Sequence, residues 1–356
     1  MDEKGLVLTG DRPTGPLHLG HFVGSLRKRV ELQNKGHPVF IIIADWQVLN
    51  EDPSRSGMIR DNIKRIILDY LSVGIDPERT NIFIQSQVSA ITTLTEIFAQ
   101  ITPYGWVDRN PTVREEMKRY LESTGRANKI KEGKEKHEFT VGFFTYPISQ
   151  AADILFCKGE IVPVGKDQEP HINLARDIAG RFNDIYGRYI FPKPEAWIDE
   201  TTPRLPGLGG PDIKMSKSAG NAVFLSDPLD VVREKLKTAF TDPLKIRKGD
   251  VGHPDGCPIF AYWNAFSREW GDVQEVRNGC ESGRLGCLDC KNRLFGNVLQ
   301  PFLEEIRERR MVAEYSADIW AIARKGTDAA NRAGEATLAE VREVMGINYP
   351  KLSDTE

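Results

Sequence analysis

Residues 8–21 read LTGDRPTGPLHLGH, and this stretch favours a strand, a tight loop and the start of a helix. Residues 6–8 form a short apolar run that suits a buried strand, and the glycines and prolines that follow prevent regular structure. We expect a helix over residues 17–35, with His18 and His21 on one face of its first turn. Unpaired backbone N–H groups and the helix dipole attract anions there, so the stretch predicts a phosphate site. The alternative is an ordinary connection with two surface histidines.

A second motif, KMSKS at residues 214–218, follows a loop rich in glycine and proline. Lysines on a mobile tether suit phosphoryl or nucleotidyl transfer, because they can close on charge that develops between the reacting phosphate and its leaving group. The HLGH and KMSKS motifs, in this order, resemble the paired signature of class I aminoacyl-tRNA synthetases. The resemblance implies that the catalytic residues are His18, His21, Lys214 and Lys217.

Composition marks a soluble globular protein of two domains or one large one, with 356 residues, 40% of them apolar and 28% charged. A net charge of −3 argues against indiscriminate coating of nucleic acid. We expect a cytoplasmic protein with no membrane association, because signal, lipidation and long apolar segments are absent from the sequence. Its five cysteines should then be reduced thiols or metal ligands.

The first 225 residues alternate short apolar runs with amphipathic stretches, which predicts an α/β fold, a doubly wound parallel sheet of the Rossmann-like kind. Amphipathic spacing also predicts a helix over residues 54–73, ended by Gly74. The expected strands are 6–8, 39–44, 81–85 and 161–164. Ligands lie at the carboxyl ends of such strands, so these segments should converge: 10–21, 45–47, 85–87 and 165–168.

Residues 109–136 are polar and rich in lysine, which predicts an exposed, mobile loop. A lid or a contact with the tRNA acceptor stem is the functional alternative. Beyond it, Pro147 suits the first turn of a helix on which Tyr146, Gln150 and Asp153 share a face at i, i+4 and i+7. A buried polar trio needs hydrogen-bond partners, which a small amphipathic ligand would supply. Alternatively the trio satisfies itself or faces water.

Residues 161–172 predict a strand, a glycine turn and a new helix. Asp167 could there accept a ribose hydroxyl pair, while Gly165 lets an adenosine approach the backbone. The sequences AADIL at 151–155 and PVGKDQ at 163–168 resemble tryptophanyl-tRNA synthetases, and the likeness extends over nearly the whole chain. Tyrosyl-tRNA synthetases share the polar trio but usually carry GGSDQ at the later turn.

The resemblance implies a tryptophan-tRNA ligase that uses ATP and Mg²⁺, acts on L-tryptophan and tRNA(Trp), and forms a homodimer. Asp153 would accept the indole N–H, and Tyr146 with Gln150 would hold the ammonium group. The implied tryptophan site comprises Leu8, Gly10, Tyr146, Gln150, Asp153, Val162, Val164 and Gln168. The implied ATP site comprises Arg12, Pro13, Thr14, His18, Gly20, His21, Gly165, Lys166, Asp167, Leu205, Lys214, Met215, Ser216, Lys217 and Ser218.

Three residues depart from the commoner bacterial pattern: Arg12 replaces glutamine, Gln47 a histidine and His21 an asparagine. They suggest a separate branch. The alternatives in function are a tyrosyl-tRNA synthetase, an iron-sulfur sensor or redox protein on a synthetase scaffold, and a small-molecule adenylyltransferase with the same histidine motif.

Amphipathic stretches dominate residues 226–356, which predicts an α-helical second domain. In class I relatives such a domain recognises the anticodon. Helices are expected at 228–241, 259–270, 293–314, 316–333 and 336–345. Phosphate contacts could come from residues 245–248 and from Arg307, Arg309 and Arg310, although solvated helix faces explain these charges as well.

Four of the five cysteines lie in this second domain with the spacing Cys-x22-Cys-x6-Cys-x2-Cys. Such a group favours a metal site, for which zinc is the default on general grounds. Some tryptophanyl-tRNA synthetases carry this spacing and a [4Fe-4S] cluster, so the resemblance implies a cluster, with Zn²⁺ as the alternative. The predicted ligands are Cys257, Cys280, Cys287 and Cys290. Cys157 lies outside the group and should be an ordinary buried residue.

Overall fold

The computed structural model describes residues 4–51, 53–125, 139–198, 205–216, 220–247 and 249–349. Within these residues the chain forms a five-stranded parallel sheet in the order β3-β2-β1-β4-β5. The strands are β1 (Val7–Asp11), β2 (Val39–Ile43), β3 (Thr80–Ile84), β4 (Ile161–Pro163) and β5 (Glu195–Trp197). The strand order reverses between β1 and β4, which is where a doubly wound sheet binds its ligand. The predicted Rossmann-like fold class is therefore confirmed.

Alternate residues of β2 explain why both faces of the sheet are covered. Ile41 and Ile43 pack with α1 (Leu19–His21), α2 (Arg27–Asn34) and α4 (Ser56–Ser72) in one apolar core. Phe40 and Ile42 belong to a second core with α5 (Ser89–Ile101), α9 (Val141–Leu155) and α10 (Glu169–Tyr186). A strand buried on both faces reads as a continuous apolar run, and β2 is VFIII.

Three local expectations differ from the structure. The helix expected over residues 17–35 starts at Leu19 and contains a π-helical turn, Phe22–Leu26, between α1 and α2. Pro147 lies inside α9 and not in its first turn, because the helix already begins at Val141. Thr140 caps it by accepting a hydrogen bond from Phe143 N. The edge strand β5 (EAW) is not predicted by the sequence, since none of its three residues is fully buried and no apolar run marks it.

The stretch expected to be a mobile loop, residues 109–136, contains a helix, α7 (Pro111–Ser123), which follows α6 (Tyr104–Asp108). Val113, Met117 and Leu121 are buried at helical spacing on α7. Charged residues between these positions, such as Arg114, Glu115 and Arg119, obscure this narrow apolar stripe in the sequence. Of the same stretch, residues 126–138 lie outside the described part of the chain.

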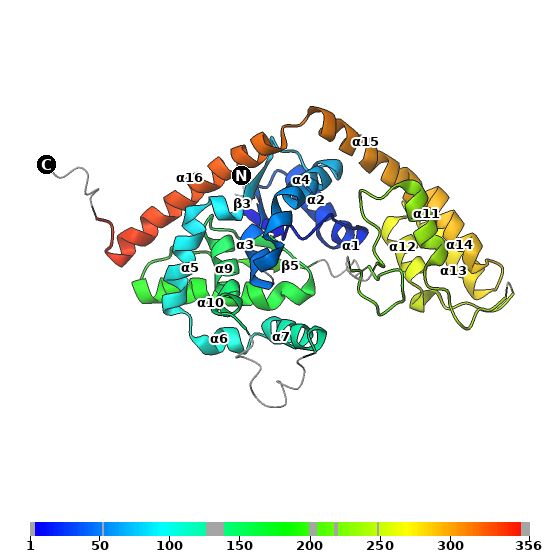
Figure 1. Cartoon of the computed structure of the whole chain (residues 1–356), viewed down its shortest axis with the longest axis horizontal. Helices are drawn as coiled ribbons and strands as arrows, with labels where there is room; N and C mark the ends of the chain where they lie inside the picture. The colour runs from blue at the N-terminus through cyan, green and yellow to red at the C-terminus, as the bar shows by residue number, and fades with distance from the viewer. Residues whose placement is uncertain are drawn as a thin grey trace.

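The C-terminal part is helical, as predicted, with α11 (Leu229–Thr238), α12 (Pro258–Phe266), α13 (Trp270–Glu281), α14 (Cys287–Arg293), α15 (Gln300–Ser316) and α16 (Ile319–Met345). Figure 1 shows α11–α14 as a lobe beside the sheet, with α15 leading from that lobe towards α4. The two last expected helices are one, α16, which packs on β3 and α5. Gly326 permits this contact, because a Cβ there would lie 2.0 Å from Ile82 O.

The division of the chain at residue 225 remains a prediction, since α16 returns from the helical lobe to the sheet. In the described part of the chain, no helix is both long and apolar enough to cross a membrane.

Candidate active site

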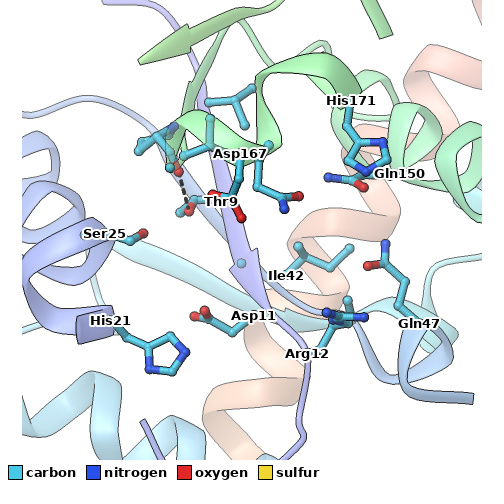
Figure 2. A pocket seen from close by; sticks show the side chains of 18 of the residues that line it. Thr9, Asp11, Arg12, His21, Ser25, Ile42, Gln47, Gln150, Asp167 and His171 are labelled. Carbon is cyan, nitrogen blue, oxygen red and sulfur yellow. Dashed lines mark hydrogen bonds between the residues drawn. The ribbon is translucent and has the colours of Figure 1, made fainter. Parts of the chain in front are cut away.

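A cavity of about 1240 Å³ opens at the carboxyl ends of β1 and β4. Sites for one small molecule usually measure about 300–1,000 Å³, so this cavity has room for two substrates side by side. Figure 2 shows His21 and Ser25 at one end, and Gln47, Gln150 and His171 together at the other. Thr9 of β1 lies between the two ends, where its hydroxyl donates to Pro163 O at 3.5 Å.

His18 and His21 hold each other in a reciprocal capping arrangement at the start of α1. Nδ1 of His18 accepts from His21 N at 3.3 Å, and Nδ1 of His21 accepts from His18 N at 3.1 Å. Their ring centroids lie 3.7 Å apart. Since Nδ1 is the acceptor in both rings, the network assigns the proton of each neutral ring to Nε2. Both rings therefore offer an N–H donor at a cavity wall, as an anion site requires.

Asp11, at the end of β1, anchors a buried charged group beside these histidines. Its Oδ2 accepts from Arg29 Nη1 at 2.6 Å and from the Tyr70 hydroxyl at 2.7 Å. Burial alone would raise the pKa of Asp11, but the charge of Arg29, the charge that His21 carries when it is protonated, and the hydrogen bonds from Arg29 and Tyr70 lower it to about 2. The carboxylate is thus ionised at neutral pH, and its orientation is fixed from two sides.

The segment that carries Lys214 folds back on itself through Asn221. Asn221 Oδ1 accepts from Ser216 N at 2.9 Å, and its Nδ2 donates to Lys214 O at 3.0 Å. Met215 is buried and lies against Gly20, where an added Cβ would be 3.3 Å from the Met215 sulfur. Lys214 Nζ lies 3.9 Å from Asp167 Oδ2, with both side chains more than half exposed. This motif therefore contacts the HLGH motif through Met215, and Lys214 lies beside Asp167 at the cavity wall, while Lys217 and Ser218 lie outside the described residues.

At the other end, Asp153 is 3% exposed and held by two amide side chains. Gln47 Nε2 donates to Oδ2 at 2.7 Å, and Gln85 Nε2 lies 2.8 and 2.9 Å from the two carboxylate oxygens. Burial raises the pKa of Asp153 to about 7, although the hydrogen bonds from both glutamines act in the opposite direction. Asp153 is therefore a carboxylate acceptor poised to ionise near neutral pH.

Tyr146 belongs to a polar chain that joins three helices. Its hydroxyl donates to Glu116 Oε2 at 2.5 Å and lies 3.3 Å from His171 Nε2. Burial, with a smaller effect of Arg12, lowers the pKa of His171 to about 4, so this imidazole is neutral at pH 7. His171 Nδ1 is buried and makes no hydrogen bond within the described residues.

All eight residues expected in the tryptophan site line the cavity, and so do most of those expected in the ATP site. Pro13 and Ser216 do not line it: Pro13 O accepts from Asn62, and Ser216 N bonds to Asn221. Of the other segments expected at the crevice, Gln47 reaches the cavity, whereas Gln85 lies behind Asp153. Among the lining residues that the sequence interpretation assigned to neither site are Asp11, Glu116, Phe143 and His171. The apolar residues at helical spacing on α7 predict a helix there, and this was the signal from which a role for Glu116 could have been expected.

The four cysteines of the helical lobe are free thiols, and each is partly buried. Burial, with smaller contributions from Cys257, Cys280 and Cys287, raises the pKa of Cys290 to about 12, so the four sulfurs lie within electrostatic range of one another. The nearby indole N–H of Trp263 lowers the pKa of Cys290, although it makes no hydrogen bond of normal length within the part of the chain that the structure describes. No group of three or more His, Cys, Asp or Glu side chains is arranged to hold a metal ion within the ranges that the structure describes.

A model of the family described as tRNA synthetases class I (W and Y) matches residues 2–302. A tryptophan–tRNA ligase of Streptococcus mutans is 42% identical over 352 residues, covering 97% of this chain and 99% of the relative. One from Aquifex aeolicus is 37% identical, covering 96% and 99%. The crystal structure of Campylobacter jejuni tryptophanyl-tRNA synthetase complexed with ADP and tryptophan is similar, with a TM-score of 0.77, 28% identity and coverage of 96% and 99%. The chain therefore belongs to the class I tRNA synthetases of the tryptophan and tyrosine family.

Proposed function

We propose that this chain is a tryptophan–tRNA ligase, which activates L-tryptophan with ATP and transfers it to tRNA(Trp). The observation that carries the proposal is one cavity with a buried carboxylate, Asp153, at one end and the paired donors His18 and His21 at the other. Tyrosine would offer Asp153 a hydroxyl donor instead, so this carboxylate alone does not separate the two amino acids, whereas the PVGKDQ turn at residues 163–168 favours tryptophan. The relatives of this chain that are named tryptophan–tRNA ligases match almost its whole length, which favours tryptophan as the substrate here too.

The amino acid occupies the Asp153 end of the cavity. Leu8, Val162 and Val164 offer the apolar walls that an indole ring needs, and Asp153 accepts the indole N–H. The ammonium group lies towards Tyr146 and Gln150, where Glu116 supplies a negative charge. The tryptophan carboxylate then points towards the phosphate end.

ATP occupies the end formed by the HLGH motif, with its ribose at Asp167. The tryptophan carboxylate attacks the α-phosphate in line, and pyrophosphate leaves. Donors on His18 and His21, with Lys214 and Lys217, stabilise the charge that develops on the phosphates. Mg²⁺ enters with the triphosphate and so needs no cage made of protein alone. The tRNA terminal ribose then attacks the adenylate, which releases AMP without a covalent enzyme intermediate.

Amino-acid-dependent exchange of pyrophosphate into ATP tests the activation step. We expect exchange with tryptophan and none above background with tyrosine or phenylalanine, followed by charging of tRNA(Trp). Exchange driven by tyrosine would favour the tyrosyl alternative. Activation without charging of any tRNA would favour a sensor or a small-molecule adenylyltransferase on this scaffold. We also propose that the enzyme acts in the cytoplasm, where charged tRNA is used in protein synthesis.

We also propose that Cys257, Cys280, Cys287 and Cys290 hold a [4Fe-4S] cluster. Their spacing, Cys-x22-Cys-x6-Cys-x2-Cys, supports this, as does the resemblance to those tryptophanyl-tRNA synthetases that carry such a cluster. A bound cluster would supply folding free energy to residues 257–290. Anaerobic purification followed by iron, sulfide and zinc analysis tests it. Stoichiometric zinc without iron would establish the Zn²⁺ alternative.

A homodimer is proposed as well. Tyr104 on α6 and Val141 on α9 are 57% and 82% exposed, and the Tyr104 ring lies 6.0 Å from that of Phe144. Apolar side chains exposed on neighbouring helices favour a protein contact there. Sedimentation equilibrium should give twice the chain mass, and Val141→Glu should shift the protein to monomers.

A further inference from the structure

The loop between β1 and α1 is held along its length by one helix, α4. At its start, Asp11 accepts from the Tyr70 hydroxyl at 2.7 Å. In its middle, Pro13 O accepts from Asn62 Nδ2 at 3.0 Å. At its end, Leu17 N donates to Asp69 Oδ2 at 2.8 Å. The three α4 side chains are all buried, and Asn62 and Asp69 are two helical turns apart on one face.

The last of these contacts depends on a residue from the C-terminal part of the chain. Asp69 is 0% exposed, and its Oδ1 accepts from Arg310 Nη1 of α15 at 2.5 Å. A buried carboxylate is tolerated only when paired, and removal of one partner leaves an uncompensated charge. Arg310 is itself 14% exposed and so is not placed to meet a tRNA phosphate, which corrects the sequence interpretation of this residue.

We infer that Arg310 is a positioning residue for the ATP site. It orients Asp69, and Asp69 fixes the backbone of Leu17, the residue directly before His18. Helix α15 leads from the cysteine-containing lobe (Figure 1). Through Arg310 and Asp69 it is connected to Leu17 and so to the start of the HLGH motif. A shift of α15 against α4 therefore changes how the loop meets the phosphates. The inference rests on the proposed function, because it concerns the ATP end of the same cavity.

Arg310→Met keeps the length of the side chain and removes its charge. In pyrophosphate exchange we expect the KM for ATP to rise about tenfold, with the dissociation constant for tryptophan, measured without ATP, unchanged within about twofold. Arg309→Met is the matched control, since Arg309 lies next to Arg310 and reaches α4 only through Ser72 O at 3.4 Å. The control should keep wild-type kinetics. Arg310→Lys should recover part of the ATP affinity.

The double variant Asp69→Asn with Arg310→Met separates positioning from stability. It buries no unpaired charge, so its melting temperature should return towards wild type, whereas the KM for ATP should stay raised because nothing orients the amide. If the double variant recovered both the melting temperature and the KM for ATP of the wild type, the inference would be overturned. A normal KM for ATP in Arg310→Met alone would overturn it as well. Wild type without tryptophan-dependent exchange would instead refute the proposed function.

Discussion

Asp153 should make tryptophan binding depend on pH near neutrality. The indole N–H needs an ionised acceptor, and burial raises the pKa of Asp153 to about 7. Binding of the N–H favours the ionised form, so affinity should rise with pH and fall as the carboxyl is protonated. With a pKa of about 7 in the free enzyme, affinity at pH 6 should be about tenfold weaker than at pH 8.

Equilibrium dialysis with labelled tryptophan, without ATP, measures this dependence directly. The matched ligand is the analogue in which sulfur replaces the indole N–H, because it has the same shape and nothing to donate to Asp153. Its affinity should not improve as the pH rises from 6 to 8.

The matched variant is Asp153→Asn, which keeps an acceptor of similar shape but cannot ionise. At pH 8 it should bind tryptophan about 1–1.5 kcal/mol more weakly, roughly five- to tenfold, since a hydrogen bond to a charged acceptor exceeds a neutral one by about that amount. Its affinity should be flat from pH 6 to 8. A flat profile for the wild-type enzyme, or equal pH dependence for the sulfur analogue, would refute the role of Asp153.

Three other perturbations test the remaining parts of the site. Lys214→Ala should lower the single-turnover adenylation rate about 10²-fold while the dissociation constant for ATP changes less than about threefold; weakened ATP binding with normal adenylation would contradict a role in the transition state. Cys287→Ser should abolish the broad visible absorption of the cluster and reduce aminoacylation more than pyrophosphate exchange, and equal losses would argue against a site remote from catalysis. Asp11→Ala should lower the unfolding free energy by about 3–5 kcal/mol, because Arg29 is left buried without its partner. In the wild type this stabilisation should be present above about pH 4 and be lost as the pH falls through about 2, which an acid-unfolding series can measure against a variant that lacks the carboxylate.

Local signals in the sequence were sufficient for the sheet and for most of the cavity. Apolar runs at 39–44 and 161–164 predicted β2 and β4 to within one residue, since a strand buried on both faces has no polar alternation to disguise it. The loop at 8–21 and the spacing of Tyr146, Gln150 and Asp153 depend on neighbouring residues only. Parallel strands then bring their carboxyl ends together whatever the details of packing, so these segments were expected to converge.

Tertiary structure alone decided which polar side chains meet. Asp153 is held by Gln47 and Gln85, which are 106 and 68 residues away in the chain, and Arg310 pairs with Asp69 across 241 residues. The spacing of residues along the chain does not predict such pairs, because they depend on how two helices or strands that are distant in the sequence pack together. The charge of Arg310 is the same in the sequence whether it faces water or a buried carboxylate. Only the packing of α15 on α4 shields Arg310 from water and pairs it with the buried Asp69.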